Sequence, residues 1–190
     1  MIELKNISKS FEGKKVLDSF NCVFEQGGYL LKGPSGIGKT TCIMLILGLM
    51  KPDEGEVILP GETRFAVCFQ ENRLFEKETV LTNITAVNEN VTEADAKKAF
   101  LELLPADALD KKAGELSGGM KRRLAVIRAM LHVSDVVILD EPFTGLDDEA
   151  RTATIAFINR HLNGRLLIIT SHDERGLDGL RAVSIDPVET

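Results

Sequence analysis

The residue pattern with the clearest chemical meaning lies in the first quarter of the chain. Residues 33–40 read Gly-Pro-Ser-Gly-Ile-Gly-Lys-Thr and match G-x-x-x-x-G-K-[ST], the pattern of a phosphate-binding loop. Glycines let such a loop curl tightly, so that several backbone N–H groups converge on one phosphate. The lysine supplies charge for the β- and γ-phosphates, and the threonine hydroxyl contributes to a Mg²⁺ site. The predicted nucleotide-binding residues are Gly33, Pro34, Ser35, Gly36, Ile37, Gly38, Lys39, Thr40 and Thr41, with Thr40 also a metal ligand.

Further polar residues follow short apolar runs. These residues are Gln70, Asp140, Glu141 and His172, and the runs before them span 65–69, 136–139 and 166–170. Such runs are typical of buried parallel strands, whose carboxyl ends meet at one edge of a sheet. Together with the loop, this edge would hold the groups that phosphoryl transfer to water requires.

Each of these polar residues has a chemical interpretation and a structural alternative. Asp140 is suited to hold the metal, Glu141 to act as the base for the attacking water, and Gln70 to contact both metal and water. His172 could donate a hydrogen bond to the γ-phosphate. Alternatively, either carboxylate could cap a helix, and a lone histidine after a strand is more often an ordinary surface or core residue. Because these four residues occur in the same chain as a phosphate-binding loop, the catalytic interpretation is favoured for them.

The elements that must position these residues follow from the hydrophobic pattern. We expect strands at 2–7, 16–17, 20–24, 28–32, 57–59, 65–69, 136–139, 166–170 and 181–185, with a polar loop at 8–15. Helices are expected at 40–50, 79–88, 93–104 and 117–132, and a last one from Asp147 or Asp148 to Asn163. In the 117–132 helix the expected buried stripe is Leu124, Ile127 and Leu131, and the basic residues expected largely outside it are Lys121, Arg122, Arg123 and Arg128.

This order of elements predicts one α/β domain over residues 1–190. Its core would be a mostly parallel sheet, with an antiparallel β layer built from the N-terminal residues. Residues from about 71 to 116 show no strand pattern, so we expect them to form a helical lobe inserted into the core.

The motifs, taken in order, resemble those of the ABC-type ATPase domain, which has a P-loop NTPase core. The resemblance covers nearly the whole chain and rests on the P-loop, Gln70, Leu-Ser-Gly-Gly-Met at 116–120, 136–141, Gly-Leu-Asp at 145–147 and His172. The Leu-Ser-Gly-Gly signature is highly specific to this family, whereas the P-loop alone would also admit kinases and GTPases. The chain departs from the family in having Met120 where Gln is usual, Gly145 where Ala is usual, and a short overall length.

The resemblance implies a mechanism in which two such domains, arranged head to tail, enclose two ATP molecules. Ser117, Gly118 and Gly119 would then contact the γ-phosphate bound by the partner's P-loop, and Asp147 would lie in a loop that crosses the interface. Phe11 has two interpretations. From its sequence context alone it would anchor a loop on the core, whereas the resemblance places it where an aromatic ring stacks on adenine.

Composition limits the cellular setting. The chain has 190 residues, a net charge of −6 and three cysteines without metal-ligand spacing, which indicates buried free thiols and a reducing cytoplasm. The acidic balance disfavours direct binding to nucleic acid. We see no signal peptide, and the longest apolar run, 42–50, is about half the ~18 residues that a membrane-spanning helix needs. We therefore expect a soluble protein that reaches a membrane only through a partner.

The combined hypothesis is an ATP-hydrolysing subunit of a bacterial ABC transporter. It would use ATP and Mg²⁺, form a homodimer, and bind an integral membrane permease subunit on the cytoplasmic face of the cell membrane. Residues 69–75 and 79–84 further resemble importers of the nitrate, sulfonate and taurine type. The alternatives are a soluble ABC-type ATPase that acts on ribosomes or nucleic acid, and a nucleotide-binding regulator without hydrolysis.

Overall fold

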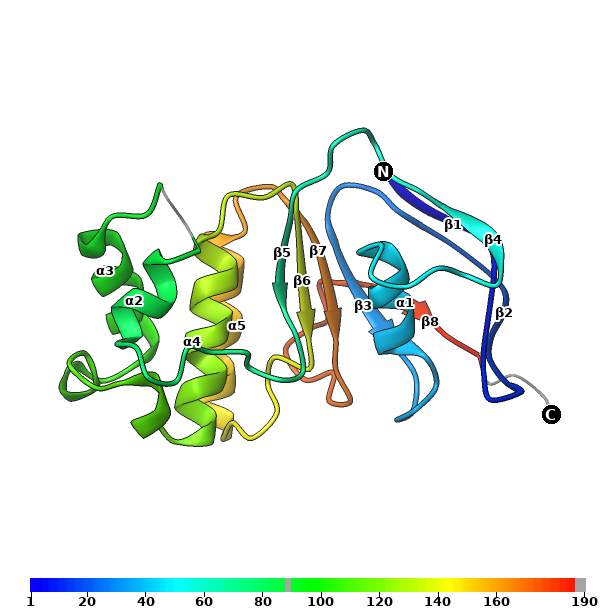
Figure 1. Cartoon of the computed structure of the whole chain (residues 1–190). Helices are drawn as coiled ribbons and strands as arrows, with labels where there is room; N and C mark the ends of the chain where they lie inside the picture. The colour runs from blue at the N-terminus through cyan, green and yellow to red at the C-terminus, as the bar shows by residue number, and fades with distance from the viewer. Residues whose placement is uncertain (88–89, 187–190) are drawn as a thin grey trace.

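The computed structural model describes residues 1–87 and 90–186, which form two β-sheets and two sets of helices (Figure 1). In the larger sheet the strand order is β5-β6-β7-β3-β8, and every neighbouring pair is parallel. Its strands are β3 (Gly28–Lys32), β5 (Phe65–Cys68), β6 (Val136–Asp140), β7 (Leu166–Thr170) and β8 (Arg181–Ser184). The predicted α/β class with a mostly parallel sheet is confirmed.

The smaller sheet is antiparallel, as predicted, and its strand order is β2-β1-β4. Its strands are β1 (Ile2–Phe11), β2 (Lys14–Phe24) and β4 (Glu54–Ile58). The predicted polar loop at 8–15 is wrong, because β1 and β2 form a tight hairpin there. Glu12 and Gly13 make its two-residue turn, with φ angles of 50° and 82°. Positive φ at both turn positions matches the twist of the flanking strands.

The helices lie close to their predicted positions but are mostly shorter. They are α1 (Lys39–Ile46), α2 (Val80–Thr85), α3 (Glu93–Leu103), α4 (Gly118–Leu131) and α5 (Asp148–His161), with short 3₁₀ turns at Ala106–Ala108 and Ala113–Glu115. Asn88, the predicted end of the 79–88 helix, lies outside the described residues. Side chains of Thr92, Ser117 and Asp147 cap their helices, each accepting a bond from the N–H three residues later.

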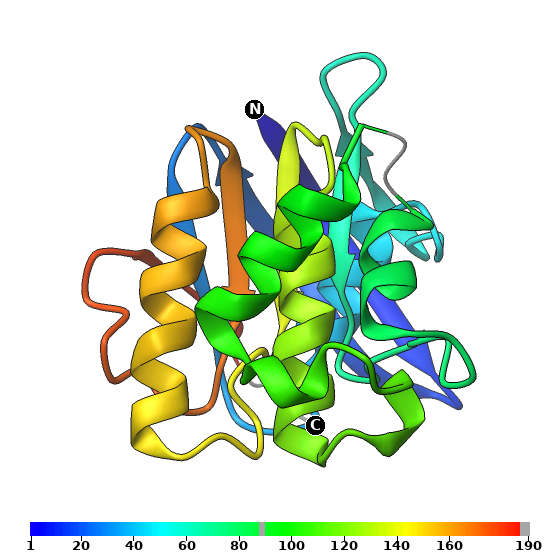
Figure 2. The ribbon, with the colours of Figure 1, turned by 90° about the vertical axis from the view of Figure 1, so that its left-hand side faces the viewer.

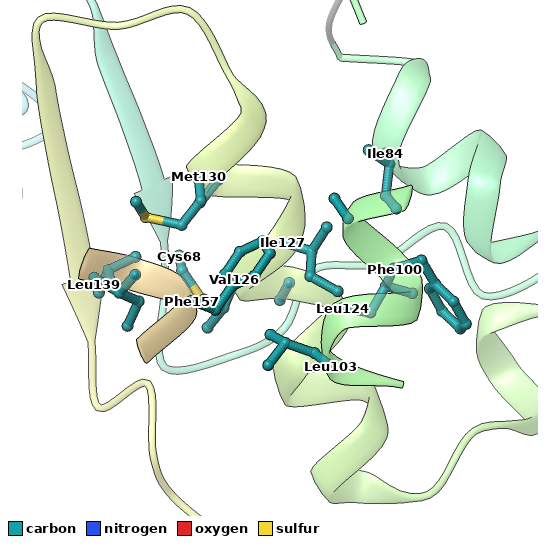
Figure 3. Close-up of a cluster of buried hydrophobic side chains, with 14 of the residues drawn as sticks. Cys68, Ile84, Phe100, Leu103, Leu124, Val126, Ile127, Met130, Leu139 and Phe157 are labelled. Atoms are coloured by element: carbon teal, nitrogen blue, oxygen red, sulfur yellow. The ribbon is translucent and has the colours of Figure 1, made fainter. Parts of the chain in front are cut away.

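Two buried clusters hold the layers together, and the larger sheet separates them. Because side chains alternate along a strand, Val136 and Ile138 of β6 face α1 and the smaller sheet, whereas Val137 and Leu139 face α4. Figures 1 and 2 show α1 on one face of the sheet and α2 to α5 on the other. Figure 3 shows the cluster on the face covered by α2 to α5. In it, Phe157 of α5 and Ile127 of α4 lie between Leu139 and the side chains of α2 and α3. The helices are therefore anchored by burial of apolar surface on both faces.

The segment at 71–116 contains helical elements and, among its described residues, no strand beyond the single bridge between Thr79 and Lys112. Asn83 of α2 is buried and ties this segment together, since its side-chain amide bonds both backbone groups of Phe75 and the carbonyl of Thr79. The residue limits of a separate lobe stay a prediction.

The cysteines are free. Cys42 and Cys68 are fully buried and Cys22 is half-buried. Burial disfavours the thiolate, so it raises the pKa of Cys42 and Cys68 and raises that of Cys22 to about 11. Cys42 and Cys68 are therefore the buried free thiols that the sequence predicted, whereas Cys22 is only half-buried.

Candidate functional site

Most of the predicted phosphate-binding residues and the predicted catalytic and metal-binding residues line one pocket of about 130 Å³, at the carboxyl edge of the larger sheet. The pocket is lined by Ser35, Gly36, Gly38, Lys39, Thr40, Thr41, Gln70, Asp140, Glu141 and His172. Of the predicted loop residues, Gly33, Pro34 and Ile37 are not among its lining; Ile37 packs against the buried cluster that contains α1.

The P-loop has the geometry that its glycines predicted. Gly38 lies in a left-handed conformation with a φ of 114°, and a Cβ atom there would come within 2.8 Å of Val16. Only glycine meets both conditions without strain. The Lys39 ammonium group donates to the carbonyls of Gly33 and Pro34, at 2.7 and 3.0 Å. Lys39 is thus held over its own loop, in reach of the pocket.

The carboxylate of Asp140 is the most enclosed acidic group of the site, with only 1% of the residue exposed. The Thr40 hydroxyl, at the start of α1, donates to its Oδ2 atom at 3.1 Å. The Thr170 hydroxyl, at the end of β7, donates to its Oδ1 atom at 2.5 Å. Both carboxylate oxygens are therefore oriented by hydroxyls from other elements. Thr170 was not among the predicted site residues, because it looks like the last residue of an ordinary strand.

Glu141 is buried and its backbone is strained, with a φ of 50° in the left-handed region. Its Oε2 atom accepts a bond from the backbone N–H of His172 at 3.3 Å. Its Oε1 atom lies 3.1 Å from His172 Nε2, yet no aligned hydrogen bond from the described residues satisfies this buried oxygen. An acceptor left open in a buried position is suited to receive a proton from a molecule that enters the pocket.

The loop that carries His172 is held from α5. The buried Arg151 side chain donates to the backbone carbonyls of Asp173 and Arg175, at 2.7 and 2.8 Å. The Ser171 hydroxyl closes the same turn by donating to the carbonyl of Asp173. Bonds from the Arg175 guanidinium lower the pKa of the Asp173 carboxyl to about 2. His172 itself is exposed at the rim of the pocket.

Arg122 corrects the prediction that the basic residues of α4 lie largely outside its buried side. The residue is only 3% exposed and lies beneath the pocket. Its guanidinium donates to five oxygens, namely the carbonyls of Phe69, Gln70, Asp140 and Glu141 and the side-chain oxygen of Asn72. Helical periodicity misses this role, because the acceptors are backbone groups at strand ends that sequence alone does not place under α4.

The signature residues lie elsewhere. Ser117, Gly118 and Gly119 begin α4 and are not among the pocket's lining. Because α1 and α4 pack on opposite faces of the sheet, the signature and the P-loop of one chain flank different sides of the same edge (Figure 1). A Cβ atom at Gly119 would lie 3.2 Å from the carbonyl oxygen of Gly145, so the signature packs directly on the Gly-Leu-Asp loop.

Phe11 ends β1 beside the hairpin turn. The residue is 42% exposed and belongs to neither buried cluster, so the interpretation as a core anchor is wrong. The ammonium group of Lys9 lies 5.8 Å from the ring centroid.

Comparison with known proteins agrees with these features. The family model described as ABC transporter matches residues 18–144. An ergothioneine transport ATP-binding protein of Helicobacter pylori is 31% identical to this chain. The match covers 98% of this chain and 96% of that protein. A spermidine/putrescine import ATP-binding protein of Spiroplasma citri (35% identical) and a Nod factor export ATP-binding protein of Burkholderia lata (36%) match 92% and 90% of this chain. The chain spans only 55% and 62% of the length of these last two relatives.

Solved structures show the same fold. The dimeric, ADP- and Pi-bound post-hydrolysis state of the ATP-binding cassette MJ0796 superposes with a TM-score of 0.86 at 23% identity, over 100% of this chain and 97% of that one. The chain therefore belongs to the ABC transporter family and has the fold of its ATP-binding cassette. The predicted family and the predicted P-loop NTPase fold are confirmed. Across the described residues, the helices are too short or too polar to cross a membrane.

We expect Arg122→Met to destabilise the chain. Methionine fills the space but leaves several buried carbonyls without donors, and each such group costs about 1–3 kcal/mol. The free energy of unfolding should fall by about 3 kcal/mol in total, which corresponds to a melting temperature lower by roughly 6–12 °C for a domain of this size. Lys121→Met, which removes an exposed ion pair with Glu76, is the matched control and should change stability by less than about 1 kcal/mol. Equal melting temperatures for the two variants would contradict the structural role of Arg122.

Proposed function

We propose that this chain binds ATP with Mg²⁺ in the pocket described above and hydrolyses it with Glu141 as the general base. The observation that carries the proposal is the buried, unsatisfied Oε1 atom of Glu141 beside His172, in a pocket also lined by Lys39 and Asp140. A proton acceptor, a phosphate-binding loop and a metal-binding carboxylate in one pocket are the parts that water attack on a γ-phosphate requires.

The residues present fit a Mg²⁺ ion. Thr40 Oγ1 and Asp140 Oδ2 lie 3.1 Å apart, and Gln70 lines the same pocket. These are oxygen donors, which Mg²⁺ prefers, and one carboxylate together with substrate phosphates is its usual protein setting. When bound, the ion would neutralise charge on the β- and γ-phosphates.

The protein groups then have separate tasks. Lys39 and the backbone N–H groups of the P-loop bind the phosphates, and a donor on His172 would contact the γ-phosphate. Glu141 accepts a proton from water as the water oxygen attacks phosphorus and the bond to ADP breaks. Gln70 lines the same pocket and would orient that water. Glu141 lines this pocket and has a strained backbone, a feature that is common at functional sites.

We propose further that the complete site forms between two chains arranged head to tail. Ser117, Gly118 and Gly119 offer a hydroxyl and a helix N-terminus, a combination suited to an anion. They lie on the opposite side of the sheet from their own P-loop, so a second chain would bring them to the nucleotide. The exposed ring of Phe11, at the end of β1, is available to stack on adenine.

The transport partner in this proposal is an integral membrane permease subunit, which would hold the chain at the cytoplasmic face of the cell membrane. Its contact would be residues 70–75 and the helical segment that follows. Three large apolar side chains are exposed there, Phe75, Val87 and Leu101. Exposed apolar side chains of this kind favour a protein contact. The named relatives include one import and one export protein, so the proposal covers transport in either direction.

We expect Glu141→Gln to bind Mg-ATP but to hydrolyse it at least 100-fold more slowly, because removal of a general base typically costs 10²–10⁴-fold. Nucleotide affinity and steady-state phosphate release would be measured on the same preparations. Glu62→Gln, at an exposed loop position, is the control and should retain the original rate. Equal rates for Glu141→Gln and the unaltered chain would exclude Glu141 as the base.

A mixing experiment tests the shared site. Lys39→Ala disables the P-loop, and Ser117→Arg blocks the signature, so each variant alone should be inactive. A mixed dimer pairs the intact P-loop of one chain with the intact signature of the other at one of its two sites. Random mixing should therefore restore about a quarter of the original ATPase activity, as a symmetric two-site dimer requires. A mixture no more active than its components would contradict the shared site.

Capture from cells tests the transport partner. Tagged Glu141→Gln, isolated from gently solubilised cells with Mg-ATP, should bring down a stoichiometric integral membrane protein. Lys39→Ala, which should not bind nucleotide, is the control for dependence on ATP. Recovery of ribosomes or DNA in place of a membrane protein would support the alternative of a soluble ABC-type ATPase.

A further inference from the structure

Thr170 occupies a position between the two acidic residues of the site. It is the last residue of β7, is fully buried, and follows the apolar run Leu166–Ile169. β7 pairs with β6 in parallel, and Thr170 stands directly opposite Asp140 in the register. Its side chain therefore lies beside the end of β6, where Asp140 and Glu141 are located.

The hydroxyl of Thr170 both donates and accepts a hydrogen bond. It lies 2.5 Å from Asp140 Oδ1, and since an ionised carboxylate only accepts, Thr170 must be the donor. Its lone pairs are then free to accept the backbone N–H of Glu141, at 2.9 Å. One side chain thus contacts both the carboxylate of Asp140 and the main chain of Glu141.

The hydrogen bond from Thr170 determines the orientation of the Asp140 carboxylate. With Oδ1 held by Thr170, the other oxygen, Oδ2, faces Thr40. Thr40 and Oδ2 are the pair that would contribute to the metal site. A carboxylate with only one of its oxygens oriented could rotate away from that pair, and the free Oδ1 would be a buried, unsatisfied acceptor.

We propose that Thr170 is a positioning residue that orients Asp140 for Mg²⁺ and so sets the metal affinity of the site. The inference rests on the proposed function, in which Asp140 is the metal ligand. Outer residues that orient metal ligands typically change metal affinity 10–100-fold when they are replaced. The backbone N–H of Glu141 has a second acceptor, the Thr170 carbonyl at 3.2 Å, so the hydroxyl matters more for Asp140 than for Glu141.

The test is the affinity of the site for a metal ion, measured in the full chain saturated with a non-hydrolysable ATP analogue. Mn²⁺ serves as the probe, because its binding is followed directly by magnetic resonance without any reaction. Thr170→Val keeps the shape of the side chain and removes the hydroxyl, so Mn²⁺ affinity should fall about 10–100-fold. Thr170→Ser keeps the hydroxyl and should stay close to the original affinity. Binding of the analogue without metal should be the same in all variants.

Thr154→Val is the matched control. Thr154 is equally buried, and its hydroxyl donates to the Ala150 carbonyl within α5, away from the pocket. This variant should leave Mn²⁺ affinity unchanged. Thermal melting would show whether Thr170→Val folds, and if it does not, Thr170→Ala and Thr170→Ser provide the same comparison.

Two results would overturn the inference: unchanged Mn²⁺ affinity without the hydroxyl, or an equal loss in Thr170→Ser, which would assign the effect to packing. A different result would contradict the proposed function instead. If the unaltered chain with bound analogue binds Mn²⁺ no more tightly than the free analogue does, Asp140 is not a metal ligand, and this result would be independent of Thr170.

Discussion

The site depends on one buried carboxylate that is bonded on both sides. Asp140 ends the fully buried strand β6, and hydroxyls from α1 and β7 hold its two oxygens. A charged group at such depth is tolerated only when its acceptors are satisfied. The three elements that meet at Asp140 are therefore fixed relative to one another, and with them the P-loop, Glu141 and the loop of His172.

The same edge of the sheet is supported from below by a charge of the opposite sign. Arg122 donates to the backbone carbonyls of Asp140 and Glu141, and also to those of Phe69 and Gln70. A planar guanidinium with five N–H groups suits several carbonyls at once better than a lysine does. Because Arg122 lies on α4, the helix that begins with the signature is linked directly to the segment after β5 and to the backbone of Glu141.

The departures from the family pattern leave the proposed chemistry intact. Gly145 has a positive φ of 76° and its carbonyl approaches Gly119, so it forms part of the packing between the signature and the following loop. Met120 continues α4 after the capped Ser117, and its N–H is the one that Ser117 accepts. The groups that would meet the γ-phosphate, the serine and the glycines, are retained beside it.

The sequence alone determined the parallel sheet and the residues that line the pocket. Apolar runs, glycine spacing and polar residues at strand ends are local patterns, and parallel strands bring their carboxyl ends to one edge without further information. The tertiary structure decided the rest. It turned the predicted loop at 8–15 into a hairpin, buried Arg122 beneath the strand ends, and gave Thr170 two acidic neighbours. These outcomes depend on which backbone groups of distant segments face a side chain, and hydrophobic periodicity along one segment carries no record of those groups.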